Sequence, residues 1–119
     1  MAGYVKNPTP DEVKGKIAEA LSMVKDTGKI RKGVNEVTKA IEKKTAMLVI
    51  VAEDVQPPEV VMHIPILCEE KGIPCAYVNT KKELGTAAGL IVPTSSVAIE
   101  NAGGAKELVN DIIKRLPKK

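Results

Sequence analysis

The stretch Met-Leu-Val-Ile-Val-Ala, at Met47 to Ala52, decides the fold class of this 119-residue chain. A continuous apolar run with several β-branched residues is typical of a central strand that is buried on both faces. Ile73 to Val78 predicts a second strand, and Val97 to Ile99 predicts a short third strand. Helical patterns separate these segments, so we expect an α/β layered sandwich with helices on both faces of the sheet.

Turn and capping residues divide the chain before the central strand. Thr9 is the expected cap of a first helix, which takes Pro10 as its first residue and ends at Gly28. A short extended link is expected at Lys29 to Lys32, followed by a second helix from Gly33 to Lys44. Both helices carry apolar residues at helical spacing, so each is expected to pack one face on the sheet.

The same signals predict three helices after the central strand. The first spans Pro65 to Gly72, with Ile66 and Leu67 facing inward. The second is a short helix at Thr80 to Ala87, with Thr80 as its cap. The last helix follows a turn at Asn101 to Gly104.

Charge is concentrated in one segment of a chain whose formal net charge is only +3. Lys25 to Lys44 contains seven cationic and three acidic residues, so its local charge is +4. Glu53 to Glu70 contains five acidic residues and no Lys or Arg. A concentrated basic patch attracts a polyanion more strongly than the net charge suggests, so nucleic acid is a candidate partner.

Composition excludes several function classes. Phe and Trp are absent and there are two Tyr, which excludes the aromatic platforms that stack single-stranded bases. His63 is the only histidine, and we expect Cys68 and Cys75 to be small buried apolar residues in a reducing compartment. We therefore expect no metal site and no cofactor. The sequence shows no membrane span and no signal peptide, so we expect one cytosolic domain over residues 1–119.

The second predicted helix has two different faces. At ~100° per residue, an apolar side packs on the sheet and a polar side faces outward. The apolar side comprises Val34, Val37 and Ile41, and the polar side comprises Lys32, Asn35, Glu36, Lys39 and Lys43. Lys can donate to guanine, a Glu carboxylate can accept from base amino groups, and Asn can do both. This combination predicts a surface that reads nucleic-acid bases.

Residues beside this polar side can hold phosphates. Lys29, Arg31 and Lys32 supply positive charge, and Gly33 lacks a Cβ, so a phosphate could approach the backbone closely. An alternative for Glu36 is a capping role at the helix start, and an alternative for Asn35 is an ordinary exposed helix residue.

Four apolar residues could cover a flipped-out base in a chain with so few aromatic rings: Leu90, Ile91, Val92 and Pro93. Alternatively, these four residues could form an ordinary strand of the core.

Two further functions compete with RNA binding. One is an enzyme that uses Glu36 and Lys39 as an acid–base pair, although no nucleophile–base pair is evident. The other is a protein-docking module that uses the acidic segment Glu53 to Glu70.

Several motifs resemble one family over nearly the whole chain. They are Thr-Gly-Lys-Ile-Arg-Lys-Gly-Val-Asn-Glu-Val-Thr-Lys (Thr27 to Lys39), Val-Ala-Glu-Asp-Val with Pro-Pro-Glu (Val51 to Glu59), Leu-Cys-Glu-Glu-Lys-Gly-Ile-Pro (Leu67 to Pro74) and Leu-Gly-Thr-Ala-Ala-Gly (Leu84 to Gly89). In this order they resemble the kink-turn-binding "seven-Ae" family of ribosomal proteins, in its archaeal large-subunit form.

The resemblance implies a three-layer α/β/α sandwich with a small mixed sheet, and binding to RNA kink-turns. It implies that Asn35, Glu36 and Lys39 contact tandem sheared G·A pairs and that Lys29 and Lys32 serve the RNA backbone. The loop from Leu90 to Pro93 would cover the bulged nucleotide. The chain departs from the family at Ile91, where an acidic residue is common. This difference affects what the resemblance implies about the loop's selection of RNA targets, and it does not affect the helix motif.

The resemblance also implies partners and a location. The expected RNAs are ribosomal RNA, box C/D and H/ACA guide RNAs and ribonuclease P RNA, the last of which acts in tRNA processing. The expected protein partners are other ribonucleoprotein core proteins. We expect a non-enzymatic, ribosome-associated protein of the cytoplasm that is a monomer when free.

Overall fold

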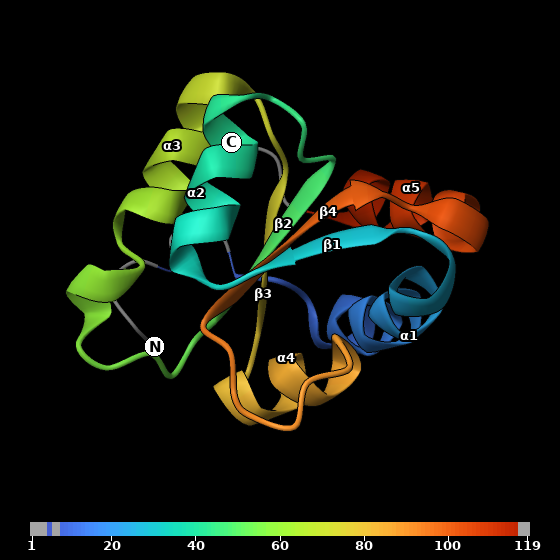
Figure 1. Cartoon of the computed structure of the whole chain (residues 1–119), viewed down its shortest axis with the longest axis horizontal. Helices are drawn as coiled ribbons and strands as arrows, with labels where there is room; N and C mark the ends of the chain where they lie inside the picture. Colours follow the sequence, from blue (N-terminus) through green and yellow to red (C-terminus); the bar gives the residue numbers. More distant parts are fainter. Residues whose placement is uncertain (1–4, 6–7, 117–119) are drawn as a thin grey trace.

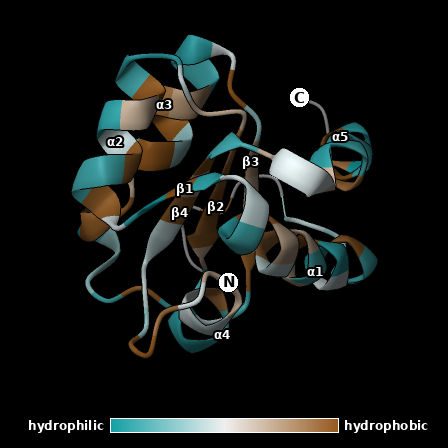
Figure 2. Ribbon diagram, turned by 45° about the vertical axis from the view of Figure 1, so that its right-hand side comes forward, coloured by the Kyte–Doolittle hydropathy of each residue, from teal (hydrophilic) through white to brown (hydrophobic). Residues whose placement is uncertain are grey.

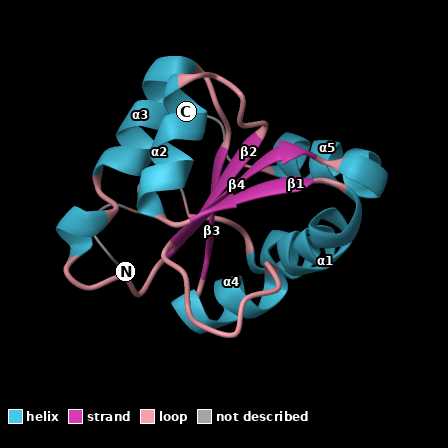
Figure 3. Ribbon diagram, in the orientation of Figure 1, coloured by secondary structure: helices cyan, strands magenta, loops and turns pink. Residues whose placement is uncertain are grey.

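A four-stranded mixed sheet lies between two layers of helices, as Figures 1 and 3 show. The computed structural model describes residues 5 and 8–116, so the ends of the expected 1–119 domain lie outside the described residues. The strands are β1 (Lys29–Lys32), β2 (Leu48–Ala52), β3 (Cys75–Val78) and β4 (Ser96–Asn101). They occur in the order β1-β4-β2-β3, with β4 antiparallel to both of its neighbours and β2 parallel to β3.

The helices cover both faces of this sheet. One layer consists of α2 (Val34–Glu42) and α3 (His63–Lys71), and the other of α1 (Asp11–Thr27), α4 (Lys81–Ala87) and α5 (Lys106–Arg115). Short 3-10 turns, η1 (Pro58–Val60) and η2 (Gly103–Ala105), precede α3 and α5. The expected three-layer α/β/α sandwich with a small mixed sheet is therefore confirmed.

The central strand is buried as its composition predicts. All five residues of β2 are buried, because helices cover both of its faces and a strand flanks it on each side. Each helix contributes one apolar face to the core; in α1 the buried residues recur at helical spacing, and they are Val13, Ile17, Ala20, Leu21 and Val24. Figure 2 shows this separation, with the hydrophobic strand β2 inside and hydrophilic helix surfaces outside.

The start of α1 differs from the sequence-based expectation. Pro10 is the N-cap residue, and no side chain caps this helix. The Thr9 hydroxyl instead accepts a hydrogen bond of 2.8 Å from the backbone N–H of Tyr77, and Thr9 is buried. The predicted cap is therefore wrong, because a contact with β3 takes the hydroxyl that a local capping rule assigns to the helix. The other predicted cap is confirmed, since Thr80 accepts from the N–H of Glu83.

The third helix begins before Pro65 and has a different inner face. It starts at His63, so Pro65 lies at its third position, where a missing N–H is still tolerated. Ile64 and Cys68 are the buried residues, whereas Ile66 is 50% exposed. Ile66 lies two residues, about 200°, from both Ile64 and Cys68 on the helix, so it faces away from the buried side and the prediction that it points inward is wrong.

Three other predicted boundaries change. The second helix ends at Glu42 rather than Lys44, because Lys44 adopts a left-handed conformation with φ 58°. The strand predicted from Ile73 begins at Cys75. The short strand predicted at 97–99 is longer: β4 spans Ser96–Asn101 and is paired on both sides, so Asn101 belongs to a strand rather than to a turn.

Burial in the central strand predicts a large effect of shortening Ile50, which is completely buried. Ile50→Ala should lower the free energy of unfolding by about 2–5 kcal/mol, because it removes apolar contacts and leaves a cavity. Ile66→Ala is the matched control and should change it by less than about 1 kcal/mol. Equilibrium urea unfolding measures both, and similar losses would contradict this assignment of core and surface.

The backbone at Gly33 predicts a second difference in stability. Gly33 has φ 91°, which L residues rarely adopt, so Gly33→Ala should cost about 1–3 kcal/mol although no atom obstructs a Cβ there. Gly15 lies inside α1 and also has open space around a Cβ. Gly15→Ala should therefore stabilise the protein by about 0.5–1 kcal/mol. Thermal or urea unfolding measures both changes in the free energy of unfolding. If both substitutions stabilised the protein, or both destabilised it, this interpretation would be contradicted.

Candidate nucleic-acid interface

The sheet brings the start of α2 and the loop before β4 to the same edge. Lys32, at the end of β1, pairs with Val97 near the start of β4. The next residue, Gly33, donates from its N–H to the Ser96 carbonyl at 3.0 Å. Because these two strands are antiparallel, the segment entering α2 and the segment entering β4 lie side by side. Sequence positions about 60 residues apart therefore lie at the same edge of the molecule.

The start of α2 presents the polar face that helical spacing predicts. Asn35, Glu36 and Lys39 are exposed, whereas Val37 and Ile41 are buried against the sheet. The positive φ of Gly33 allows the chain to leave the edge strand and enter the helix immediately. The structure therefore brings three of the predicted site residues together on one exposed surface.

Glu36 does not cap its helix. The N–H of Gly33 is already bonded to Ser96, and α2 has no side-chain cap. The Glu36 carboxylate instead lies 3.8 Å from Arg31 Nη1 and 3.9 Å from Lys39 Nζ. These separations are long and the groups are about half exposed, so the ion pairs are weak. The carboxylate can therefore exchange them for donors on a ligand.

A side-chain hydrogen bond joins α2 to α3. The Thr38 hydroxyl donates to the Val34 carbonyl at 2.7 Å, so its oxygen can accept from His63 Nε2 at 3.0 Å. Thr38 lies between Glu36 and Lys39 in the sequence. The single histidine thus links α3 to the helix that carries the polar face.

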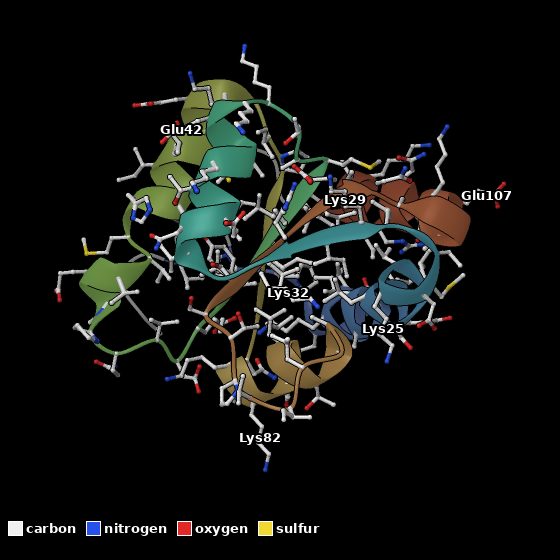
Figure 4. All side chains as sticks on the ribbon, in the orientation of Figure 1. Lys25, Lys29, Lys32, Glu42, Lys82 and Glu107 are labelled. Carbon is white, nitrogen blue, oxygen red and sulfur yellow. The ribbon has the colours of Figure 1, made fainter. Side chains whose placement is uncertain are left out.

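Positive charge continues from α2 onto β1. A pocket of about 410 Å³ lies between β1, α2 and the end of β4 and is lined by Lys29, Arg31, Glu36, Lys39, Ala40, Lys43, Thr45, Glu100 and Asn101. Four of these residues are cationic and two are acidic, so the pocket favours an anion. Figure 4 shows Lys29 and Lys32 on β1, and both are exposed. This arrangement can hold phosphates.

The loop from Leu90 to Pro93 is not a core strand. Ile91, Val92 and Pro93 are exposed and Leu90 is half-buried, so the alternative that the sequence left open is wrong. The loop backbone packs directly on α4, where the carbonyl of Val92 occupies the space that a Cβ on Gly85 would need. Figure 2 shows this hydrophobic segment at the surface beside α4. The loop thus packs its backbone on α4 and presents apolar side chains to the outside.

Four residues that line the pocket were not predicted as site residues: Ala40, Thr45, Glu100 and Asn101. Glu100 and Thr45 line the pocket, and the Thr45 hydroxyl donates to the Glu100 carboxylate. The position of Glu100 depends on how β4 pairs with β1, so no local sequence signal places it there. Thr45 follows α2, where its N–H donates to the Ala40 carbonyl. Arg31 was expected only as a phosphate ligand, yet it also contacts both acids of the pocket.

Neither a candidate metal site nor a membrane-spanning helix is found among residues 5 and 8–116. No group of three or more His, Cys, Asp or Glu side chains in this part of the chain could hold a metal ion. No helix within it is long and apolar enough to cross a membrane. Cys68 is buried as expected, whereas Cys75 is only half-buried. A hydrogen bond with Cys75, together with burial, raises the pKa of the Cys68 thiol, so this thiol stays protonated.

Comparison with known proteins gives the family. The sequence profile described as "Ribosomal protein L7Ae/L30e/S12e/Gadd45 family" matches residues 15–109, which include both halves of the surface described above. The fold is similar to that of the 15.5kD RNA binding protein of Giardia lamblia, with a TM-score of 0.89 and 27% sequence identity. That similarity covers 98% of this chain and 97% of the other. The chain therefore belongs to the ribosomal protein L7Ae/L30e/S12e/Gadd45 family.

Proposed function

We propose that this protein is a non-catalytic RNA-binding protein that recognises kink-turns. In such RNAs a bulge bends two stems beside tandem sheared G·A pairs. The observation that carries the proposal is the exposed set Asn35, Glu36 and Lys39, which lies on one side of α2 beside cationic β1. Membership of a ribosomal protein family, and the printed name of the Giardia protein, support RNA as the partner.

The proposed roles follow from the chemistry of each group. Lys39 donates to guanine, Glu36 accepts from base amino groups, and Asn35 does both. A pure phosphate binder gains nothing from Glu36, since its carboxylate repels the RNA backbone. Lys29 and Lys32 hold phosphates instead, and the absence of a Cβ on Gly33 lets the backbone approach closely.

The shape of RNA favours a kinked target. The major groove of a regular RNA duplex is too deep and narrow for side chains to read. A bend opens that groove to the end of a helix such as α2. The exposed loop from Leu90 to Pro93 then covers the bulged nucleotide with apolar side chains.

We extend the proposal to particular targets. They are ribosomal RNA, box C/D and H/ACA guide RNAs and ribonuclease P RNA, on which the protein would nucleate ribonucleoprotein assembly and serve tRNA processing. Residues 1–119 would act as one RNA-binding domain that is a monomer when free. The expected setting is an archaeal large ribosomal subunit, in the cytoplasm.

A second candidate function is docking of another ribonucleoprotein core protein. Val60 on η1, Met62 in the turn that follows, and Ile66 on α3 are large exposed apolar residues within the acidic segment Glu53 to Glu70. Exposed apolar groups of this kind suit a protein partner. Docking is compatible with RNA binding, because α3 lies beside α2 on the same face of the sheet.

An enzyme that uses Glu36 and Lys39 has less support. Both side chains border the 410 Å³ pocket, but Glu36 is 48% and Lys39 is 64% exposed. Acid–base catalysis at neutral pH depends on burial that shifts such groups from their ordinary pKa values. The exposed arrangement suits reversible contacts with a ligand.

Substitutions on α2 should separate base reading from charge attraction. Asn35→Ala and Lys39→Ala should each weaken binding to a kink-turn RNA by about 1–3 kcal/mol, because each removes a contact with the sheared pairs. Lys43→Ala should weaken binding to every RNA alike, since it removes only positive charge. Gel-shift titrations measure these affinities against the kink-turn RNA and a control RNA without the sheared pairs.

The same titrations, repeated over a range of salt concentrations, can also contradict base recognition. Salt weakens phosphate contacts in both RNAs, but a base reader still prefers the kink-turn when both affinities fall. Equal effects of all three substitutions on both RNAs would contradict base recognition.

Substitution in the exposed loop should lower the affinity for kink-turn RNA without lowering the stability of the protein. Ile91 is fully exposed, so Ile91→Ser should leave unfolding unchanged but weaken kink-turn binding by about 1–2 kcal/mol through lost apolar contact. Ile66→Ser, on α3, is the matched control and should not affect RNA binding. Replacing the bulged nucleotide with an abasic linker should abolish the effect of Ile91→Ser. An effect that persists with the abasic RNA would show that Ile91 does not cover the base.

A further inference from the structure

Glu100 is a carboxylate set into the basic surface of β1 and α2 by an irregularity in the sheet. Asn101 of β4 pairs with Lys29, and Ile99 pairs with Ile30, so Glu100 is an extra residue opposite β1. Such β-bulges redirect side chains out of the regular alternation of a strand. Here the Glu100 side chain lines the 410 Å³ pocket and is only 12% exposed.

Both oxygens of this carboxylate have partners. Arg31 Nε donates to Oε1 at 2.9 Å, and Lys29 Nζ lies 3.7 Å from the same oxygen. The Thr45 hydroxyl, just after α2, donates to Oε2. Glu100 therefore connects β4 to β1 and to the segment that follows α2.

These partners keep Glu100 ionised. The hydrogen bond from Thr45 lowers the pKa of the carboxyl below its ordinary value of 4.5, and Arg31 and Lys29 lower it further. Burial acts in the opposite direction but does not prevail. At neutral pH the pocket therefore contains a fixed negative charge beside its cations.

The same arginine reaches the proposed base-reading group. While Arg31 Nε is bound to Glu100, Arg31 Nη1 lies 3.8 Å from the Glu36 carboxylate. A guanidinium forms its best ion pair through two parallel hydrogen bonds to one carboxylate. Its bond to Glu100 directs Nε away from Glu36 and limits that contact to a long single approach. Without Glu100, Arg31 could close fully onto Glu36 and occupy both oxygens.

We propose that Glu100 is a positioning residue for RNA selectivity: it holds Arg31 in place and so leaves the Glu36 carboxylate available to bases. This inference rests on the proposed function, because it concerns how the same surface reads RNA. Glu100 does not touch RNA in this account. It also offsets one positive charge in the pocket, which limits attraction to RNAs that lack the motif.

Glu100→Gln tests the proposal against a control with the same change in charge. A Gln side chain has one oxygen, so it cannot accept from Arg31 and Thr45 at two separate atoms. The ratio of affinities for kink-turn and control RNA should fall about 5- to 10-fold. Affinity for the control RNA should stay the same or rise, since the net charge increases by one.

Glu107→Gln is the matched variant. Glu107 is exposed on α5, on the far side of the molecule from α2 in Figure 4. It also raises the net charge by one, and it should leave the affinity ratio unchanged. Equal ratios for Glu100→Gln and Glu107→Gln would overturn the proposal.

A measurement on the free protein separates this inference from the proposed function. Exchange of the Arg31 Nε–H with water, followed by nitrogen-15 NMR, should be slow in the wild type and in Glu107→Gln but fast in Glu100→Gln. Unchanged exchange in Glu100→Gln would overturn the positioning role. If the wild-type protein did not discriminate between the two RNAs, the proposed function would be overturned instead. The exchange measurement needs no RNA, so it would still test whether Glu100 holds the Arg31 side chain.

A conservative variant covers the case in which Glu100→Gln does not fold. Glu100→Asp keeps the charge but shortens the side chain by one methylene. It should accelerate Arg31 exchange and lower the affinity ratio while folding is retained. A folded Glu100→Asp protein with wild-type exchange and a wild-type ratio would overturn the proposal.

Discussion

The antiparallel pairing of β1 with β4 is the constraint on which the candidate RNA surface depends. It places the start of α2 beside the loop that enters β4, although these segments are far apart in the chain. Residue 33 must then turn from an edge strand into a helix, and Gly33 does so with a positive φ. Without this pairing, the polar face of α2 and the apolar loop would not lie beside each other.

The electrostatics of the surface suit recognition better than simple attraction. Lysines on β1 and α2 supply the long-range field that draws in a polyanion. The negative charges of Glu36 and Glu100 oppose that field. Glu36 is exposed beside cations, whereas Glu100 is nearly enclosed by them. Acids kept within a basic patch lower nonspecific affinity, and on this account they contribute selectivity for base edges instead.

Local physics predicts much of this fold but not its long-range contacts. The run in β2 is apolar throughout and the cap at Thr80 is local, so the sequence alone predicts both. Thr9 could not be assigned correctly, because its hydroxyl serves a strand that is distant in sequence. Glu100 was missed because a bulge appears only when two strands are paired. Ile91 looks like core in composition, and only the packing of the loop on α4 shows that it is exposed.

The central claim is that one RNA contacts the start of α2 and the loop before β4 together. A nitrogen-15 NMR titration of the free protein with a kink-turn RNA tests it most directly, because backbone amides report contact residue by residue. We expect the largest shifts at Gly33 to Lys39 and at Leu90 to Val92, and smaller shifts with an RNA that lacks the sheared pairs. Shifts confined to α3, or identical with both RNAs, would contradict the account.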